Sequence, residues 1–406
     1  MRTEVVALLV AVVLFLVYLL IERVLLDRRL ESIPLRIAVT GTRGKSSVVR
    51  LLTSILRADG RSVLAKTTGS EARYLLPDGE EAMVPRRGVA SIIEQKKLIK
   101  KAAALGADCL VAEIMSIHPE NHRIEAHRLL RPQIIVLTNV RRDHTDAMGE
   151  TEEEIAEVLS LGFTPGATIF VSERENRPAF VAAAEEMRGK LLQVVGGSES
   201  TVAAGPEGGP AEQHARPLQL GSAEFPENLD LAWAIGRHLG IAESLIAAGI
   251  RDAAADAGAV RVWECRSDQG ARSCYLVNGF AANDPQSTLH VVNRVRAALP
   301  SCPERLTGLL TLRPDRGDRT MQWIDALQGG ELECFDPLYV TGAHAHAMKR
   351  KLPGLRILNG DQPEQMMATI LADLPDGGVV FGCGNYVGTG QVLVDHWERT
   401  GRRHGL

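Results

Sequence analysis

The sequence has no excess of basic charge. Its 46 Lys and Arg residues are outnumbered by 50 Asp and Glu, the formal net charge is -4, and no run of Lys and Arg breaks this balance. Since attraction to a phosphate backbone needs a basic surface, nucleic acid is not expected as a partner. With 45% apolar and 24% charged residues over 406 positions, the chain is long enough to bury two cores.

Cysteine is scarce and shows no motif. The sequence contains no C-x-x-C pair and no Cys/His spacing typical of a zinc site. The cysteines are therefore interpreted as isolated, reduced thiols, which fits a reducing cytosol. They stand at positions 109, 265, 274, 302, 334 and 383.

A long apolar run stands near the N-terminus. It is unbroken from Val5 to Ile21, and Val24 to Leu26 extend it after two charged residues. The run approaches the roughly 20 residues that cross a bilayer core of about 30 Å. Because no A-x-A-like cleavage site follows it, we expect an uncleaved anchor over residues 1–27, in preference to a signal peptide.

The charges that flank this run predict its orientation. Arg23, Arg28 and Arg29 follow the apolar segment and only Arg2 precedes it. The positive-inside tendency then gives a single-pass protein of the cell membrane, with the bulk of the chain in the cytoplasm, where ATP is available.

The rest of the sequence alternates between short apolar stretches and helical patterns, which is typical of α/β domains with mostly parallel sheets. We expect one domain over residues 28–258 and a smaller, Rossmann-like domain over 259–406. A Gly-, Ser-, Ala- and Pro-rich segment at 196–217 is expected to be a loop. Strands are expected at 35–40, 62–65, 108–114, 133–138, 168–171, 274–277, 306–312, 338–341 and 378–381. The main helices of the first domain are expected at 45–58, 89–104, 151–159 and 227–239.

A compact glycine loop follows the first strand. Gly41-Thr42-Arg43-Gly44-Lys45-Ser46 fits G-x-x-G-K-S, which is shorter than the pattern of most phosphate loops. Glycines allow backbone N–H groups to turn toward phosphate oxygens, the next helix presents its N-terminus, Lys45 supplies a charge, and Ser46 can hold magnesium. With the adjacent Ser47, this segment predicts a nucleotide triphosphate site.

The compact loop resembles that of the Mur ligase superfamily, whose members activate a carboxylate with ATP and couple it to an amine. The whole chain, with its N-terminal anchor, resembles the ligase subunits of poly-γ-glutamate synthase. This resemblance implies a Mur-type ATP-binding domain, with ATP and Mg²⁺ as cofactors.

Two strand ends carry the resemblance further. Glu113 ends an apolar run at the sheet edge where ligands of open α/β folds gather, and an unpaired carboxylate there would need a cation. The resemblance makes Glu113 a magnesium ligand. Thr68, in the segment Lys66 to Gly69, is expected to approach the same magnesium and the γ-phosphate. A Glu that simply faces solvent at a strand end is the alternative.

The segment Thr138 to Asp146 includes Asp143-His144-Thr145-Asp146. The resemblance makes His144 a ligand of a second magnesium. Many Mur ligases add a carbamylated lysine, but this chain has no lysine between Lys101 and Lys190. Water or an acidic residue such as Glu153 or Glu157 is the hypothesis for its replacement. His118, His122, His344 and His346 are interpreted as non-catalytic.

Three further segments complete the expected site. By resemblance Asn228 contacts adenine, and a helix N-cap is its alternative role. Asn278 to Pro285 resembles the "NGFAAND" stretch of the same subunits, with Asp284 as its carboxylate. Arg316, in the loop from Arg313 to Arg319, is expected to bind phosphate or a substrate carboxylate.

The resemblance implies an ATP-dependent ligase that forms γ-glutamyl bonds through an acyl phosphate, releasing ADP and phosphate. Lys45, Glu113 and His144 are the expected catalytic residues. Glutamate, the growing poly-γ-glutamate chain, the membrane and other membrane subunits of the synthase are the implied partners, and a homo-oligomer is compatible with the sequence. The alternatives are a membrane-anchored phosphate-loop kinase or nucleotide switch, and a noncatalytic assembly subunit.

Overall fold

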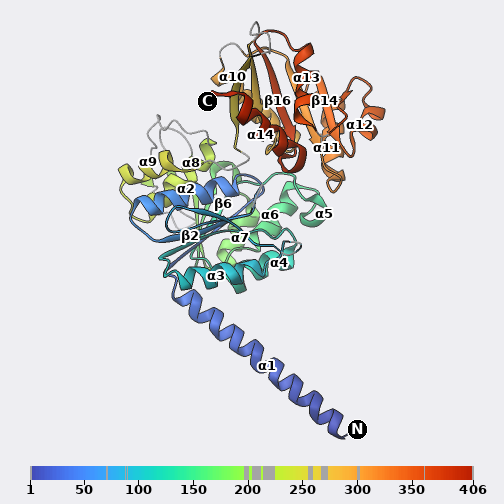
Figure 1. Cartoon of the computed structure of the whole chain (residues 1–406). Helices are drawn as coiled ribbons and strands as arrows, with labels where there is room; N and C mark the ends of the chain where they lie inside the picture. Colours follow the sequence, from blue (N-terminus) through green and yellow to red (C-terminus); the bar gives the residue numbers. More distant parts are fainter. Residues whose placement is uncertain are drawn as a thin grey trace. The chain divides into compact units, whose positions relative to one another are not determined.

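The computed structural model describes residues 2–69, 72–86, 88, 90–195, 201–203, 212–213, 225–254, 259–266, 273–299, 302–360 and 362–404. The chain divides into two compact units, Met1–Asp256 and Ala257–Leu406, which are described separately (Figure 1).

The described part of unit 1 forms a ten-stranded sheet in the order β10-β9-β8-β7-β6-β1-β5-β2-β3-β4. From β8 to β2 the neighbouring strands pair in parallel, and the strands at both edges are antiparallel. The expected mostly parallel α/β sheet is therefore confirmed. The strands are β1 (Leu35–Thr40), β2 (Val63–Thr67), β3 (Arg73–Leu75), β4 (Glu81–Met83), β5 (Cys109–Glu113), β6 (Ile134–Leu137), β7 (Thr168–Ser172), β8 (Lys190–Val194), β9 (Thr201–Ala203) and β10 (Glu212–Gln213).

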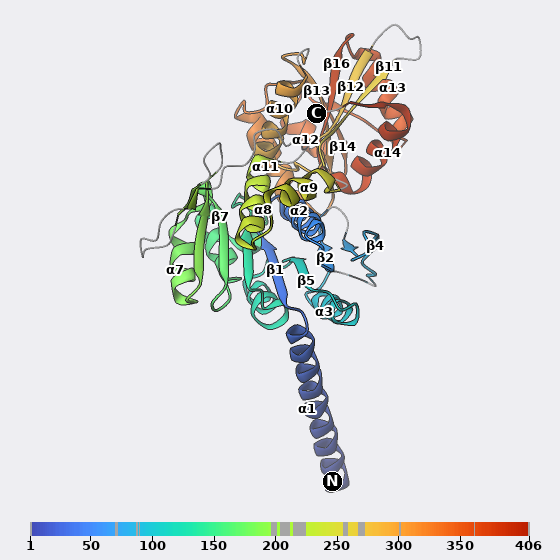
Figure 2. The ribbon, with the colours of Figure 1, turned by 90° about the vertical axis from the view of Figure 1, so that its left-hand side faces the viewer.

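Helices cover both faces of this sheet because alternate strand residues point to opposite sides. Ile37 and Val39 of β1 pack in one core with α2, α8 and α9, whereas Ala38 packs in another with α3. Figure 2 shows β1 and β5 between these two layers. The helices of unit 1 are α1 (Arg2–Glu31), α2 (Lys45–Ala58), α3 (Glu94–Ala104), α4 (Pro119–Ile124), α5 (Thr145–Met148), α6 (Glu152–Ser160), α7 (Pro178–Glu186), α8 (Pro226–His238) and α9 (Glu243–Asp252).

Two expectations for unit 1 need correction or restriction. The helix expected from residue 89 begins at Glu94, because residues 91–93 form a turn in which the Ser91 carbonyl accepts the Glu94 N–H. Residue 89 itself lies outside the described residues. Most of the segment 196–217 lies outside them too, and its described part pairs as the antiparallel strands β9 and β10.

Helix α1 is continuous from the apolar run into the core of unit 1. Its large apolar side chains from Val5 to Leu25 are exposed, whereas Leu26, Leu30 and the following Ile33 are buried with residues of α3. The helix is long and apolar enough to cross a membrane, with a mean hydropathy of 3.0 over its most apolar stretch. Its last turns are nevertheless part of the folded unit.

The described part of unit 2 forms a seven-stranded sheet in the order β15-β14-β13-β16-β12-β11-β17. Along this order, neighbouring strands from β15 through β14, β13 and β16 to β12 pair in parallel, and β11 and β17 add an antiparallel edge. This second α/β domain was expected. Its strands are β11 (Arg261–Arg266), β12 (Ser273–Asn278), β13 (Leu306–Leu312), β14 (Phe335–Gly342), β15 (Arg356–Ile357), β16 (Gly378–Gly384) and β17 (Arg402–His404). Its helices are α10 (Pro285–Ala298), α11 (Gly317–Gln328), α12 (Ala345–Lys351), α13 (Pro363–Asp373) and α14 (Gln391–Thr400).

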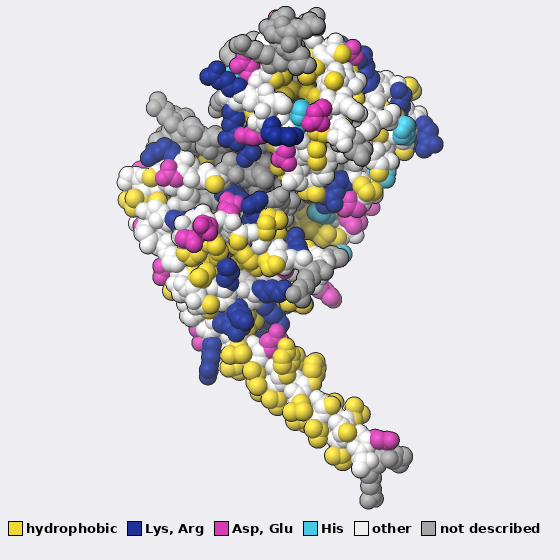
Figure 3. Space-filling model, viewed as in Figure 1, with side chains coloured by type: hydrophobic (Ala, Val, Ile, Leu, Met, Phe, Trp, Pro, Cys, Tyr) yellow, Lys and Arg dark blue, Asp and Glu magenta, His cyan; other side chains and the backbone are white. Residues whose placement is uncertain are grey.

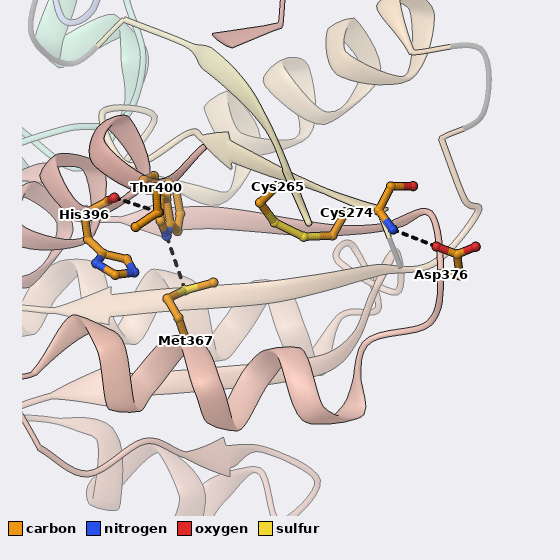
Figure 4. Close-up of a disulfide and its surroundings, with 8 residues drawn as sticks. Cys265, Cys274, Met367, Asp376, His396 and Thr400 are labelled. Carbon is orange, nitrogen blue, oxygen red and sulfur yellow. Dashed lines mark hydrogen bonds between the residues drawn. A yellow bond between two sulfur atoms is a disulfide. The ribbon is translucent and has the colours of Figure 1, made fainter. Parts of the chain in front are cut away.

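One cysteine pair contradicts the interpretation of six isolated thiols. Cys265 and Cys274 are register partners on β11 and β12, with Cα atoms 5.2 Å apart, and form a disulfide (Figure 4). Directly opposed positions of an antiparallel pair bring Cβ atoms close enough for this bond. The spacing in the sequence does not reveal the pair, because it becomes a cross-strand contact only once the hairpin is known.

Candidate functional site

The loop between β1 and α2 has a backbone that two glycines make possible. Gly41 has φ +124° and Gly44 has φ +79°, in the region that favours glycine. A Cβ on Gly41 would also lie 2.2 Å from the Thr138 hydroxyl oxygen. The backbone conformation therefore favours glycine at both positions of the predicted motif. At Gly41, the close approach of the segment after β6 also leaves no room for a side chain.

Asn139 braces this loop from the neighbouring strand end. Its main-chain carbonyl accepts from the Thr42 N–H at 3.0 Å, and its side-chain oxygen accepts from the Thr42 hydroxyl at 2.8 Å and from the Arg43 N–H at 3.0 Å. Asn139 lies within the segment Thr138 to Asp146, but the sequence alone does not indicate this role. The signal that could have found it is an amide directly after a buried strand that pairs with β1.

Lys45 begins α2 and folds back over the loop. Its Nζ donates to the carbonyls of Gly41 at 2.8 Å and Thr42 at 3.3 Å. The first N–H groups of a helix have no acceptor within the helix, so the start of α2 presents donors beside this cation. A cation and helix N–H groups at one point suit an anion such as a phosphate.

Glu113 contacts two of the other predicted residues, Ser46 and Thr68. It ends β5, next to β1 in the sheet, and is only 3% exposed. One carboxylate oxygen accepts from the Ser46 hydroxyl at 2.9 Å and from the Thr68 N–H at 2.7 Å. Thr68 thus contacts Glu113 through its main-chain N–H. Its hydroxyl was expected to approach the magnesium and the γ-phosphate. The alternative of a solvent-facing Glu113 is wrong.

The Glu113 carboxylate oxygens and the Ser46 hydroxyl form a candidate site for a divalent cation. No group of three or more His, Cys, Asp and Glu side chains suited to a metal occurs among the residues that the structure describes. Magnesium, however, is usually held by one or two carboxylates together with substrate phosphates and water. The buried Glu113 carboxylate and the Ser46 hydroxyl beside the loop fit that mode of binding.

His144 is linked to the loop through its neighbour. The Asp143 side chain is 5% exposed and lies 3.4 Å from the Arg43 guanidinium and 3.9 Å from the His144 Nε2. His144 itself has φ +51°, a left-handed conformation that costs energy for a residue with a side chain. Asp146 is exposed on α5.

The two acidic residues proposed in place of a carbamylated lysine both lie on the surface of α6. The Glu153 side chain is 80% exposed and lies 3.4 Å from Arg177. Glu157 is also exposed. Neither has the burial of Glu113 or Asp143, so the structure gives this hypothesis no support.

Asn228 packs against the loop from α8. It is 3% exposed, and a Cβ on Gly44 would lie 2.8 Å from its side-chain oxygen. The N-cap of α8 is Phe225, so the alternative role of Asn228 as a helix cap is wrong. Ser47 lies half-buried in the first turn of α2. Unit 1 therefore brings together the predicted loop, Thr68, Glu113 and Asn228, with His144 joined through Asp143.

The remaining predicted residue lies in unit 2. Arg316 is the residue before α11. Nearby, Arg313 pairs with Asp315 at 2.6 Å. Asp284 caps α10, because its side chain accepts from the Ser287 N–H at 2.8 Å. The carboxylate of the "NGFAAND" stretch thus has an observed structural role.

A buried ion-pair cluster that the sequence did not indicate links β2 to the start of α3. The fully buried Lys66 ammonium lies 2.9 Å from the Glu94 carboxylate, which also accepts from Arg86 at 2.8 and 3.1 Å. Burial alone would raise the pKa of Glu94, but the hydrogen bonds from Arg86 and Lys66 outweigh it and hold that pKa at about 2. Burial lowers the pKa of Lys66, and Glu94 opposes this shift.

Replacing Glu94 by glutamine is expected to lower the free energy of unfolding by about 3–5 kcal/mol at neutral pH, because Lys66 would keep a buried charge without its counter-ion. The folded pKa of Glu94 lies below its ordinary 4.5. Its stabilisation is therefore present above about pH 4.5 and is lost as the pH falls toward about 2. Urea unfolding over this range should show the difference between wild type and Glu94→Gln shrinking. A constant difference would contradict the assignment, and Glu243→Gln, at an exposed position, is the control.

The glycine loop and the carboxylate beside it lie in a segment that matches a Mur ligase domain, and this match together with the relatives defines an ATP-dependent ligase of the Mur ligase superfamily. Residues 39–195 match the Mur ligase middle domain, and residues 264–400 match the poly-gamma-glutamate synthase CapB C-terminal domain. The chain belongs to the CapB family, because a CapB protein is also at least 30% identical to it over most of both chains.

Individual relatives extend over nearly the whole chain. The capsule biosynthesis protein CapB of Bacillus anthracis is 31% identical over 95% of this chain and 81% of its own length. The PGA synthase CapB of Bacillus subtilis is 29% identical over 96% of both chains. A crystal structure of a bifunctional folylpolyglutamate synthase/dihydrofolate synthase with Mn, AMPPNP and L-glutamate bound has a TM-score of 0.66 at 17% identity, covering 92% of this chain and 93% of its own. Capsule and poly-γ-glutamate synthesis is thus the setting of this family of amide ligases.

Proposed function

We propose that the protein extends poly-γ-glutamate by forming γ-glutamyl amide bonds at the expense of ATP. The observation that carries the proposal is the junction of Ser46, Thr68 and Glu113 beside the glycine loop, in a chain of the CapB family. Glutamate as substrate is also supported by the structural neighbour that holds L-glutamate.

The proposed reaction has two steps. A γ-carboxylate oxygen of the growing chain attacks the γ-phosphorus of ATP, which forms an acyl phosphate and releases ADP. The amine of an incoming glutamate then attacks the acyl carbon, loses a proton and expels phosphate. Each cycle therefore converts one ATP to ADP and phosphate for each amide bond.

The glycine loop supplies the phosphate contacts in this proposal. Asn139 already occupies the N–H groups of Thr42 and Arg43, so phosphate oxygens would meet the first turn of α2, where Ser47 lies. Lys45 would exchange its two carbonyl acceptors for phosphate oxygens and stabilise the charge on the leaving ADP. Asn228, packed on Gly44, is the proposed contact for adenine.

Ser46 and Glu113 would hold magnesium, with His144 as the proposed ligand for a second ion. When bound, the metal offsets negative charge on the phosphates. Arg316 of unit 2 is proposed to bind phosphate or a substrate carboxylate through its guanidinium fork. In this proposal, the ATP-binding domain spans residues 28–258 and the substrate domain spans residues 259–406.

We propose further that α1 is an uncleaved membrane anchor and that both units lie in the cytoplasm. Removal of α1 as a signal peptide would take Leu26 and Leu30 out of a core in which they are buried. It would also break the ion pairs of Glu22 with Lys96 and Asp27 with Arg131. The other membrane subunits of the synthase are the proposed partners of the exposed part of the helix.

The test follows membranes that contain the protein with labelled glutamate, ATP and magnesium. We expect ADP release that depends on glutamate, together with labelled polymer. The amount of ADP released should equal the number of amide bonds formed. AMP as the product, or ADP release that does not respond to glutamate, would refute the mechanism. Polymer formation that survives loss of nucleotide turnover would instead assign the chain an assembly role.

A further inference from the structure

A basic pocket opens at the edge of unit 1 opposite the glycine loop. It has a volume of about 690 Å³ and lies between the end of η1 (Glu125–Leu130), the start of β6 and the turn before β7. Five basic side chains line it, and the lining includes no carboxylate. They are Arg36, Arg123, His127, Arg128 and Arg131.

Two of the pocket arginines have no acidic partner among the described residues. Arg123 and Arg128 are exposed, and within the described part of the chain neither forms an ion pair. Both lie near His127, whose pKa is lowered by burial and further by these two neighbours, against a hydrogen bond with the Leu161 carbonyl. A cluster of guanidinium groups without counter-charges suits a bound anion, and the planar fork suits phosphate in particular.

The other two arginines connect the pocket to the end of α1. The Arg36 guanidinium donates to the carbonyls of Leu30 and Ile33 at 2.9 and 2.8 Å. Arg131 lies 2.7 Å from the Asp27 carboxylate. One wall of the pocket is therefore built onto the last turns of the helix that carries the exposed apolar surface.

The length of that apolar surface places the pocket at headgroup depth. From Val5 to Leu25 a helix extends about 31 Å, close to the hydrocarbon thickness of about 30 Å. Asp27 follows Leu25 by about 3 Å along the helix axis, within a headgroup layer of about 5–7 Å. Figure 3 shows apolar side chains along α1 and Lys and Arg side chains where the helix meets unit 1. Among the exposed residues of this region are Arg28, Lys97 and Lys100.

We propose that this pocket binds the phosphate headgroup of an anionic phospholipid from the leaflet in which α1 ends. Arg123 and Arg128 contact the phosphate, while Arg36 and Arg131 hold the pocket against the helix. The inference rests on the proposed membrane anchoring and adds a specific lipid site to it. A headgroup is favoured over a soluble anion because the pocket wall is continuous with the helix end.

The test uses the full-length protein in nanodiscs of phosphatidylcholine with added phosphatidylglycerol, and native mass spectrometry of the lipids that stay bound after release into detergent. Wild type is expected to retain phosphatidylglycerol in preference to phosphatidylcholine. The double variant Arg123→Gln/Arg128→Gln is expected to lower this preference roughly tenfold, since each basic residue near a membrane contributes to anionic lipid binding. The control Lys349→Gln/Arg350→Gln, which removes the same charge from exposed positions of α12, should behave as wild type.

Further measurements distinguish a lipid headgroup from a soluble anion as the ligand. If inorganic phosphate displaces the retained lipid, the pocket is a general anion site and the proposal fails. It also fails if wild type in phosphatidylcholine alone binds polyglutamate and the double variant does not. An unchanged preference in a double variant that keeps its melting temperature and ADP release overturns it as well.

Membrane extraction distinguishes this failure from failure of the anchoring. If an alkaline carbonate wash releases the full-length chain from membranes, the proposed anchor is wrong, and the lipid site falls with it. If the chain stays in the membrane and shows no lipid preference, the lipid site alone is wrong.

Discussion

Lys45→Ala is expected to reduce glutamate-dependent ADP release roughly 10²–10³-fold, which is the loss typical when one preorganised donor to a developing charge is removed. Lys45 is the cation of the glycine loop, and its ammonium already lies over the loop carbonyls of Gly41 and Thr42. In the proposed reaction it stabilises the charge that grows on the leaving ADP. The initial rate of ADP release at saturating glutamate is the measurement.

Two comparisons show whether the loss of activity is specific to the role of Lys45 in the transition state. Lys190→Ala removes a lysine at an exposed position at the start of β8 and should leave the rate unchanged. Binding of a nonhydrolysable ATP analogue to Lys45→Ala should weaken much less than turnover does, since the main effect is on the transition state. An equal loss in both would reassign Lys45 to ground-state binding, and full activity would refute its role.

Glu113→Gln is expected to lower the same rate roughly 10²-fold or more, with a rise in the metal concentration needed for half-maximal activity. The amide has nearly the shape of the carboxylate and can still accept from Ser46 and Thr68, so the substitution removes mainly the charge. A buried neutral amide is a poor partner for a divalent cation. Electron paramagnetic resonance of Mn²⁺ in the presence of nucleotide measures the loss of metal directly.

The matched control is Glu243→Gln, at an exposed carboxylate on α9 that pairs with Arg237. It should bind Mn²⁺ and turn over as wild type does. Normal Mn²⁺ binding in Glu113→Gln would show that the carboxylate positions Ser46 and Thr68 without holding the metal. A melting temperature close to that of wild type excludes loss of the fold as the cause.

Much of the first unit could be predicted from local sequence. The bounds of β1 and α2 agree with the expectation to the residue, because an apolar strand, two glycines and a helical pattern each give a strong local signal. The role of Asn139 could not be predicted in this way, since it depends on β6 pairing beside β1. The cluster of Lys66, Glu94 and Arg86 is also invisible in the sequence, because its members come from three separate segments.

Similar reasons explain the corrections. The pairing of Cys265 with Cys274 depends on the register of β11 and β12, which the spacing of the two residues does not give. The start of α3 was placed too early because the turn before Glu94 has residues compatible with a helix. Asn228 was open to two interpretations until the start of α8, with Phe225 as its N-cap, removed the capping role.

The buried end of α1 has a consequence for how the protein can be shortened. Leu26, Leu30 and Ile33 belong to the core that α3 completes, so unit 1 is complete only with the last turns of α1 in place. A truncated variant made to remove the exposed apolar side chains, which extend from Val5 to Leu25, should therefore keep the chain from Leu26 onward. A cut after Ile33 would remove part of the core together with the apolar helix.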